Sequence, residues 1–175
     1  MPSAGARAES LDSPVPALDY WAHRMFGRYP ARSGRSQVGN GAEAGSGPVE
    51  AMLGADRASS ALGIELVEGG AGFATVRMRV TGDMLNGHGT AHGGHLFLLA
   101  DTAFACACNS HGPVTVAAGA DITFVAPAWE GDELLAVARE RTRYGRSGLY
   151  DVTVLRGEQV VAEFRGRSRT TTPVK

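Results

Sequence analysis

The chain has 175 residues, 43% of them hydrophobic, and a formal net charge of −1. This length and composition predict one globular domain with a hydrophobic core. The near-neutral charge argues against generic nucleic-acid binding. No apolar run approaches the roughly 20 residues that cross a bilayer, and the N-terminus lacks the apolar core of a secretory signal. We therefore expect neither a nucleic-acid partner nor a membrane partner.

The two cysteines, Cys106 and Cys108, are separated by a single residue. This spacing matches neither a disulfide framework nor a thioredoxin-like C-x-x-C, so it favours a reduced, cytoplasmic protein. All but one of the 17 basic residues are arginines, and many lie between Arg139 and Arg169. A locally basic C-terminal part suits a small anionic ligand better than a polyanion.

Residues 1–48 are rich in Gly, Ala, Ser, Pro and Arg and show no sustained period. This composition predicts a disordered N-terminal extension. Within it, residues 18–29 carry apolar side chains that suit a short amphipathic turn or helix, namely Tyr20, Trp21, Met25 and Phe26. Two interpretations stay open for this segment: a surface appendage without a catalytic role, or a docking segment for a partner subunit.

The globular domain is predicted over residues 49–172. A helix is predicted over residues 48–62, with Pro48 at its start and Gly63 at its stop. Strands are predicted over residues 64–67 and 72–80, with a turn over residues 68–71. In the second strand one face is apolar and the other carries arginines, which indicates burial of one face; the apolar positions are Val76, Met78 and Val80, and the arginines are Arg77 and Arg79.

A long apolar helix follows, and after it come four strand signals, over residues 114–125, 133–143, 149–155 and 160–170. Turn-like segments separate the last three of these strands from what precedes them. In the first, alternating apolar residues predict one face of a sheet: Val116, Ala118, Ala120, Ile122 and Phe124. The order of two strands, one helix and four strands favours an α+β fold with an antiparallel sheet over alternating βαβ units.

Residues 86–112 read NGHGTAHGGHLFLLADTAFACACNSHG, so a glycine- and histidine-rich loop runs into an apolar helix that carries one carboxylate, Asp101. A lone carboxylate among apolar residues is desolvated, paired, or retained because chemistry uses it. A helix that is apolar on nearly all sides must be covered on all sides. A curved sheet wrapped around the helix, with a second subunit over any bare face, meets that need.

Gly93 and Gly94 open this helix, where backbone N–H groups and the helix dipole can polarise a carbonyl or hold an oxyanion. Asp101 lies eight residues later, about 12 Å along the axis at 1.5 Å per residue. The two ends therefore cannot attend to one carbonyl within a single subunit. Two such helices packed antiparallel across a two-fold axis would bring them together, which predicts a homodimer with shared active sites.

Several segments together resemble the hotdog-fold acyl-CoA thioesterases: LNGHGTAHGGHLFLLADTAFACACNSHG, AGADITFVAPAWEGDELLAVA, GRSGLYDVTV and VAEFRGRS. More narrowly, they resemble the hydroxyphenylacetyl-CoA thioesterases of phenylacetic acid degradation, over residues 52–169. The resemblance implies a curved antiparallel sheet around a long central helix and hydrolysis of acyl-CoA thioesters, with aromatic acyl groups favoured. It also implies sites at a dimer interface and frequent assembly into homotetramers, with no cofactor.

Carried over residue by residue, the resemblance makes the Gly93 backbone the donor to the thioester carbonyl. Asp101 then activates water or attacks directly, and Asn86 and His92 take supporting polar positions. Its apolar surroundings should raise the pKa of Asp101. Residues 114–117 are expected to flank the pocket and to influence acyl preference.

Substrate-binding positions are expected at Gly94 and Thr102, beside the two catalytic positions. The basic segment 143–148 suits a clamp for coenzyme A phosphates, with Arg143, Arg146 and Ser147 as contacts.

Each of these residues also has a purely structural interpretation. Asp101 can pair with a structural arginine, His92 can cap the helix, and Asn86 can form an Asx turn. Arg143 and Arg146 can be solvated strand ends.

Parts of the sequence also suit three other functions. His88, His92 and His95 have the spacing H-x3-H-x2-H, but no Cys, Asp or Glu completes a metal site nearby, so no metal is predicted. An enoyl-CoA hydratase on the same fold would use Asp83 and His88, although the Asn of its motif is misplaced and its Pro is absent. A non-catalytic acyl-CoA-binding module is the third, but a mere binder gains nothing from a desolvated acid.

Overall fold

The computed structural model describes residues 47–171. The predictions for residues 1–46, including the segment 18–29, lie outside the described residues. The described helices are α2 (Pro48–Ala55), α3 (Arg57–Ala61) and α4 (Gly93–Asn109), with a 3-10 turn η1 (Gly82–Met84). The strands are β1 (Glu65–Gly70), β2 (Phe73–Arg79), β3 (Thr115–Phe124), β4 (Glu133–Tyr144), β5 (Ser147–Arg156) and β6 (Gln159–Thr170).

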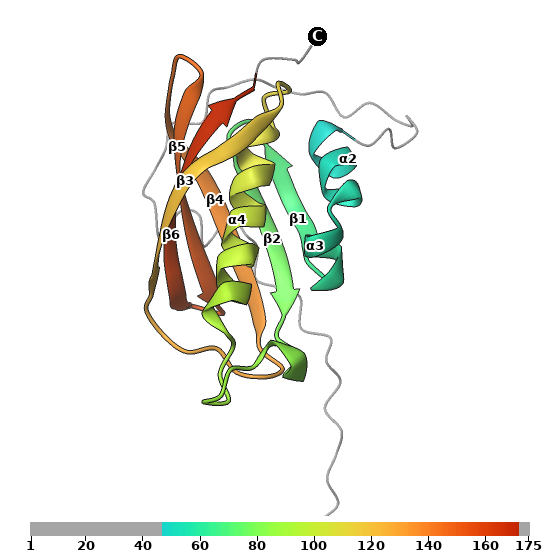
Figure 1. The fold of residues 1–175 in the computed structure, drawn as a ribbon, viewed down its shortest axis with the longest axis vertical. Coiled ribbons are helices and arrows are strands. Elements are labelled where there is room, and N and C mark those ends of the chain that lie inside the picture. Colours follow the sequence, from blue (N-terminus) through green and yellow to red (C-terminus); the bar gives the residue numbers. More distant parts are fainter. Residues whose placement is uncertain (1–46, 172–175) are drawn as a thin grey trace, which may run out of the picture. The chain divides into compact units, whose positions relative to one another are not determined.

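The strands form one six-stranded antiparallel sheet in the order β1-β2-β4-β5-β6-β3. The long helix α4 lies in the concave side of this sheet, and α2 and α3 lie beside it over the β1 end (Figure 1). Helix α4 packs mainly on β2, β4 and β5 at the centre of the sheet. The predicted α+β class and the curved sheet around a central helix are therefore confirmed.

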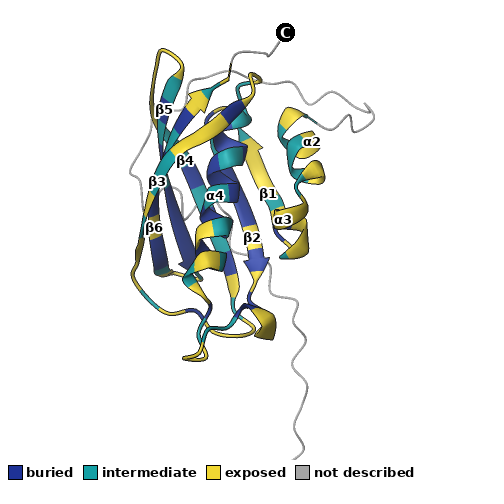
Figure 2. Cartoon of the chain, in the orientation of Figure 1, coloured by how far each residue is buried: buried dark blue, intermediate teal, exposed yellow. Residues whose placement is uncertain are grey.

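The core lies between the sheet and the inner side of α4, which is buried along most of its length (Figure 2). On β2 the predicted faces are confirmed, because Val76, Met78 and Val80 are buried while Arg77 and Arg79 are exposed. Phe104 of α4 packs closely on β6 because Gly166 carries no side chain: a Cβ there would stand 2.7 Å from the Phe104 ring. The close approach of helix to sheet therefore requires glycine at this position.

The predicted turn over residues 68–71 was wrong. Glu68, Gly69 and Gly70 stay in β1 and pair with β2, and the chain reverses at Ala71 and Gly72 instead. Gly72 alone of the three glycines in this hairpin has a positive φ, 78°. A glycine pair in the sequence marks backbone freedom, but only the pairing register decides which glycine uses it.

The single helix predicted over residues 48–62 is two helices that meet at Asp56. Asp56 has an extended backbone, with φ −81° and ψ 98°, and its side chain accepts hydrogen bonds from the N–H groups of Ala58 and Ser59. A short carboxylate that bonds to nearby backbone N–H groups starts a new helix more readily than it continues an old one. Gly63, with φ 63°, ends the second helix as predicted.

Strand β3 forms one edge of the sheet, and its predicted apolar face is only partly covered. Val116 is 47% exposed and Phe124 is 52% exposed, whereas Ala120 and Ile122 are half-buried. An irregularity between Ala117 and Gly119 also shifts the register with β6 and breaks the simple alternation. A ten-residue edge strand with exposed apolar side chains is therefore open for pairing.

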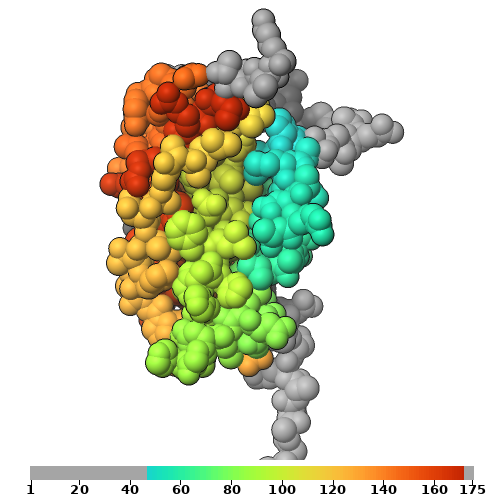
Figure 3. Space-filling view, viewed as in Figure 1, coloured from blue at the N-terminus to red at the C-terminus, as the bar shows by residue number. Residues whose placement is uncertain are grey.

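One side of α4 is likewise uncovered. Along the helix a stripe of exposed or half-buried residues recurs every three or four positions: Gly94, Phe97, Leu98, Asp101 and Ala105. Figure 3 shows this side of α4 at the surface, between α2 and α3 on one flank and β3 on the other. Among residues 47–171, no helix is long and apolar enough to cross a membrane.

Candidate active site

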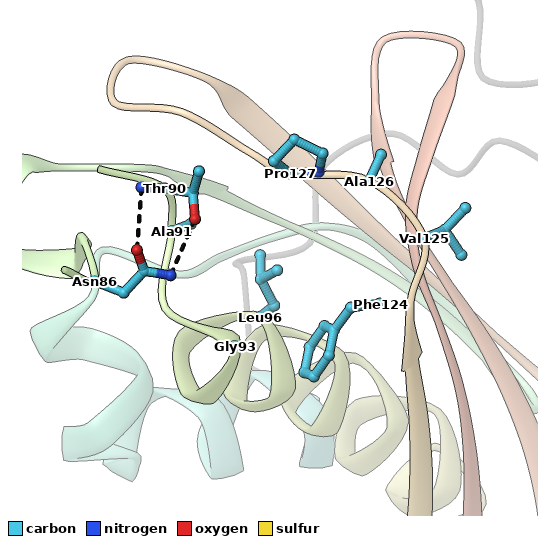
Figure 4. Close-up of a pocket in the computed structure, with 9 residues that line it drawn as sticks. All are labelled: Asn86, Thr90, Ala91, Gly93, Leu96, Phe124, Val125, Ala126 and Pro127. Atoms are coloured by element: carbon cyan, nitrogen blue, oxygen red, sulfur yellow. Dashed lines mark hydrogen bonds between the residues drawn. The ribbon is translucent and has the colours of Figure 1, made fainter. Parts of the chain in front are cut away.

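The loop before α4 is organised by Asn86. Its Oδ1 accepts hydrogen bonds from the N–H groups of His88 (2.8 Å) and Thr90 (3.3 Å), and its Nδ2 donates to Thr90 Oγ1 at 3.0 Å (Figure 4). The Asx-turn interpretation of Asn86 is therefore confirmed. An amide nitrogen carries two hydrogens, so one Nδ2 hydrogen is still available to a ligand in the hollow that this side chain lines.

His92 is the N-cap of α4, and its Nδ1 accepts a hydrogen bond from the Gly94 N–H at 3.0 Å. The capping interpretation of this side chain is thus confirmed. Because Nδ1 is the acceptor, the proton of a neutral His92 ring sits on Nε2. His92 is exposed, so its Nε2–H can also serve as a donor to a ligand at the helix start.

Gly93 presents the free donor at the helix start. Within residues 47–171, no acceptor is bonded to the Gly93 N–H, whereas the Gly94 N–H is bonded to His92. The Gly93 N–H lies at the positive end of a 17-residue helix. Of the two glycines named from the sequence, Gly93 is therefore the one that can bind a carbonyl oxygen.

A hollow of about 350 Å³ opens at this end of α4, and it brings Asn86 and Gly93 together. Its remaining wall comes from Thr90, Ala91, Leu96 and the segment that ends β3, namely Phe124, Val125, Ala126 and Pro127 (Figure 4). Residues 114–117, expected to flank the pocket, lie at the other end of β3 and do not line this hollow in the single chain. Sequence reasoning missed Phe124 as a wall residue, because only the sheet order places it against the helix start.

Asp101 lies half-buried on the uncovered stripe of α4. Its carboxylate makes no hydrogen bond and no ion pair with any residue of the described range 47–171, so the structural-arginine interpretation has no support there. Burial, and secondarily the negative charge of Asp56, raises the pKa of Asp101 above its ordinary value. A desolvated, unpaired carboxylate with a raised pKa is suited to take a proton.

Asp101 does not line the hollow at Gly93. The two residues are separated by eight helical residues, about 12 Å along the axis. Within a single chain, the Asp101 carboxylate and the Gly93 N–H therefore cannot both contact the same carbonyl group.

Thr102 is only 4% exposed, and its hydroxyl is used inside the protein. The Thr102 Oγ1 donates to the Leu98 carbonyl at 2.8 Å and lies 2.8 Å from Ser59 Oγ of α3. Its side chain thus faces α3, away from the hollow at Gly93.

Arg143, Arg146 and Ser147 come together at the β4–β5 hairpin, around a small hollow of about 10 Å³ that His111 and Tyr150 also line. This hairpin lies at the C-terminal end of α4, opposite Gly93. Both arginines are exposed, and Ser147 Oγ accepts a hydrogen bond of 3.4 Å from Arg169. Sequence reasoning also missed Glu140 here, which lies 2.6 Å from His111 Nε2 and accepts a 2.9 Å hydrogen bond from the buried Tyr150 hydroxyl.

The structure gives no support to a metal site or a hydratase site among the described residues. No group of three His, Cys, Asp or Glu side chains within the described range is arranged to hold a metal ion. Asp83 and His88, the hydratase pair, are both exposed. Burial raises the pKa of the Cys106 thiol to about 11 and that of Cys108 to about 12, so both thiols are neutral and inert near neutral pH.

Known proteins are similar to this chain in sequence and in fold. Residues 88–163 match the family model of the thioesterase superfamily. Over 119 residues the chain is 48% identical to an Escherichia coli protein, and the match covers 67% of this chain and 85% of that relative. The chain therefore belongs to the thioesterase superfamily and has its hotdog fold. The relative in question is the acyl-coenzyme A thioesterase PaaI.

Solved structures extend the likeness. The E. coli PaaI protein from the phenylacetic acid degradation operon aligns with a TM-score of 0.70 and 44% identity, covering 71% of this chain and 91% of that one. A mutant of the phenylacetic acid degradation protein PaaI from Thermus thermophilus gives 0.64 and 37%, with coverages of 66% and 100%. A Streptococcus mutans protein bound to acetyl-CoA gives 0.61 and 28%, with coverages of 64% and 91%.

Proposed function

We propose that this protein hydrolyses acyl-CoA thioesters to the free acid and CoA, with phenylacetyl- or hydroxyphenylacetyl-CoA of phenylacetate catabolism as the substrate class. The observation that carries the proposal is that two groups on α4, the Gly93 N–H and the desolvated Asp101 carboxylate, have no bonding partner among residues 47–171. The relative PaaI, an acyl-CoA thioesterase, supports the reaction, and its phenylacetic acid degradation operon supports the substrate class.

In the proposed reaction the Gly93 N–H donates to the thioester carbonyl oxygen, and Asn86 and His92 supply further donors beside it. Asp101 takes a proton from a water molecule, whose oxygen adds to the carbonyl carbon. The negative charge that develops on the carbonyl oxygen is stabilised by the helix start. The C–S bond then breaks, and the CoA thiolate leaves and takes up the proton.

A second route has Asp101 attack the carbonyl carbon directly: the C–S bond breaks, the CoA thiolate leaves and takes a proton from water, and a mixed anhydride forms. Water then attacks the Asp101 carbonyl carbon of the anhydride, which restores the carboxylate and releases the product acid. A single turnover in ¹⁸O-labelled water separates the two routes. Label in the product acid after the first turnover supports Asp101 as the base. Label in the Asp101 carboxylate supports direct attack.

Gly93 and Asp101 require a homodimer to reach the same carbonyl group. The exposed edge of β3 and the uncovered stripe of α4 lie on neighbouring surfaces and are both partly apolar (Figure 3). Strand β3 runs antiparallel to α4, since Phe124 lies at Gly93 and Thr115 is hydrogen-bonded to Asn109. Pairing two β3 edges across a two-fold axis therefore also sets two α4 helices antiparallel, with Gly93 of one facing Asp101 of the other. We expect such dimers to pair further into homotetramers.

In the same dimer, the phosphates of one CoA molecule bind to one subunit and its acyl group binds to the other. Arg143, Arg146 and Ser147 lie beyond Asp101 toward the C-terminal end of α4. The subunit that supplies Asp101 thus also supplies the phosphate clamp, and its partner supplies Gly93 and the hollow. The hollow is lined by apolar side chains such as Leu96, Phe124 and Pro127, which suit an aromatic acyl group. We also propose a reducing, cytoplasmic setting, because Cys106 and Cys108 form no disulfide within residues 47–171.

The first test is thiol release from acyl-CoA by wild type and Asp101→Asn. We expect Asp101→Asn to lower kcat by about 10²- to 10⁴-fold, the usual contribution of a general base. Glu158→Gln, which neutralises an exposed carboxylate in the β5–β6 turn, is the matched control and should keep full activity. Wild-type turnover by Asp101→Asn would overturn the proposal, and tight acyl-CoA binding without turnover by the wild type would favour a binding module.

Shared sites are tested by subunit mixing. Refolding Asp101→Asn with Gly93→Pro subunits at equal amounts produces mixed dimers, each with one intact and one doubly defective site. If half of the dimers are mixed, about a quarter of wild-type activity should return. If each subunit held its own complete site, no activity would return. Phenylacetyl-, hydroxyphenylacetyl-, benzoyl- and aliphatic acyl-CoA compared in the same thiol assay would identify the acyl preference.

A further inference from the structure

A buried hydrogen-bond chain leads from the turn of α4 that carries Asp101 to a second carboxylate, Asp56. Ser59 is fully buried, and its hydroxyl lies 2.6 Å from Asp56 Oδ2 and 2.8 Å from Thr102 Oγ1. An ionised carboxylate only accepts, so the Ser59 hydroxyl donates to Asp56. Ser59 Oγ is then an acceptor for Thr102. The single hydroxyl hydrogen of Thr102 is divided between Ser59 Oγ and the Leu98 carbonyl oxygen, each 2.8 Å from Thr102 Oγ1.

Asp56 is held in its charged form. The Ser59 hydroxyl, together with the backbone N–H groups of Ser59 and Ala58, outweighs the effect of burial and lowers the pKa of Asp56 below its ordinary value. A capped helix start also favours a negative charge. A fixed anion is thus built into the junction of α2 and α3, on the same side of the molecule as Asp101.

We propose that Asp56, acting through Ser59 and Thr102, is a positioning residue for Asp101 that fixes the turn of α4 carrying it. The inference rests on the proposed role of Asp101 in thioester hydrolysis. The chain of bonds holds Thr102, the residue next to Asp101, against α3. The charge of Asp56 acts directly on Asp101, because a like charge nearby disfavours the ionised form.

The other groups around Asp101 leave Asp56 as its main charged neighbour. On α4 itself, Cys108 interacts with Asp101, but its thiol is neutral; Glu50 of α2 acts with Asp56 on Cys106. Arg57 of α3 is exposed. The strands behind α4 present apolar residues and the Tyr150 hydroxyl, whose pKa is raised by burial and then by Glu140, so it stays protonated.

Asp56→Asn separates this role from simple capping, because Asn caps a helix about as well as Asp but carries no charge. For Asp56→Asn we expect the acid limb of the profile of kcat/KM against pH to move to lower pH, and we expect the variant to fold. Glu50→Gln, a carboxylate-to-amide change on neighbouring α2, is the control and should leave the limb in place. Ser59→Ala breaks the chain but leaves Asp56 charged and the Thr102 to Leu98 bond intact, and it should lower kcat severalfold with little change in KM.

The inference is overturned if the Asp56→Asn profile superimposes on that of the wild type, or if Ser59→Ala leaves kcat unchanged. Asp101→Asn measured in the same assay keeps the two proposals apart. Full turnover by Asp101→Asn defeats the proposed function, whatever Asp56 does. Loss of turnover in Asp101→Asn together with an unshifted limb in Asp56→Asn defeats only the role given to Asp56.

Discussion

The ring of Phe124 lies against the α-carbon of Gly93, so closely that a Cβ on this glycine would stand 2.8 Å from Phe124 Cζ. A side chain on the residue proposed to bind the carbonyl oxygen would therefore force the Phe124 ring to move. The end of strand β3 thus shapes the helix start, and the two together define where an acyl group can lie.

Gly93→Ala and Gly93→Pro distinguish the effect of an added side chain from the effect of losing the backbone N–H donor. Both add a Cβ against Phe124, but only Pro removes the N–H. Pro is well tolerated at the first position of a helix, and the extended backbone of His92, with ψ 133°, suits the residue before it. We expect Gly93→Pro to lose about 10²- to 10³-fold more in kcat than Gly93→Ala. Gly54→Ala, which meets open space in α2, is the control, and equal losses in Pro and Ala would contradict the donor role.

Phe124→Ala should change acyl preference more than overall stability, because the ring is half exposed and forms one wall of the hollow. Contacts between aromatic rings contribute about 0.5–1.5 kcal/mol, so kcat/KM for phenylacetyl-CoA should fall about two- to tenfold relative to hexanoyl-CoA. Competition between the two substrates measures this ratio directly. An unchanged ratio would place the acyl group elsewhere.

Asp101→Asn should stabilise the fold at neutral pH while it removes activity. Burial raises the folded-state pKa of Asp101, so ionisation of this residue lowers stability as the pH rises above the unfolded-state pKa, about 3.9. Asn cannot ionise. In urea unfolding at pH 7, the free energy of unfolding of the variant should therefore be higher than that of the wild type. The difference should vanish as the pH approaches 3.

Asp132→Asn provides the comparison of opposite sign. Although burial acts to raise it, the Arg156 side chain and the Trp129 N–H hold the pKa of Asp132 below its ordinary value. The stabilisation by this carboxylate is present above the unfolded pKa and is lost as the pH falls. Asp132→Asn should thus be less stable than the wild type at pH 7. A change of stability in the same direction for Asp101→Asn and Asp132→Asn would contradict the environments assigned to these two carboxylates.

Arg143→Gln should weaken binding of the nucleotide part of the coenzyme without affecting the chemistry. A hydrogen bond to a charged group contributes about 1.5–3 kcal/mol, so KM for acyl-CoA should rise at least about tenfold. KM for an acyl-pantetheine thioester, which lacks the nucleotide, should stay unchanged. Arg77→Gln, on β2 at the other end of the strand order from β3 and paired with Glu65 of β1, is the control. An equal rise for both substrates would contradict a phosphate contact.

The long helix and the buried face of β2 could be predicted from local pattern alone. The apolar run between His92 and Gly112 and the alternation around Met78 both depend on periodicity, which the chain carries in its sequence. The separation of Gly93 from Asp101 followed likewise from the helical rise. These features need no knowledge of what lies next to them.

Other features depended on neighbours that no local pattern reveals. The break at Asp56 follows from side-chain bonds that compete with a good helical pattern. The exposure of β3 follows from its place at the end of the sheet order, and the contact of Phe124 with Gly93 follows from the same order. Thr102, expected near the substrate, instead faces α3, because the second half of the split helix packs there.

If two chains pair through the β3 edge as proposed, activity depends on protein concentration. On the proposed dimer, a chain that has folded but has not met another copy holds parts of two sites and can complete neither. Specific activity should then fall on dilution and return on concentration, because mass action governs assembly. In a cell that makes little of this protein, total activity would fall more steeply than the protein concentration. The expression level would then act as a threshold for activity.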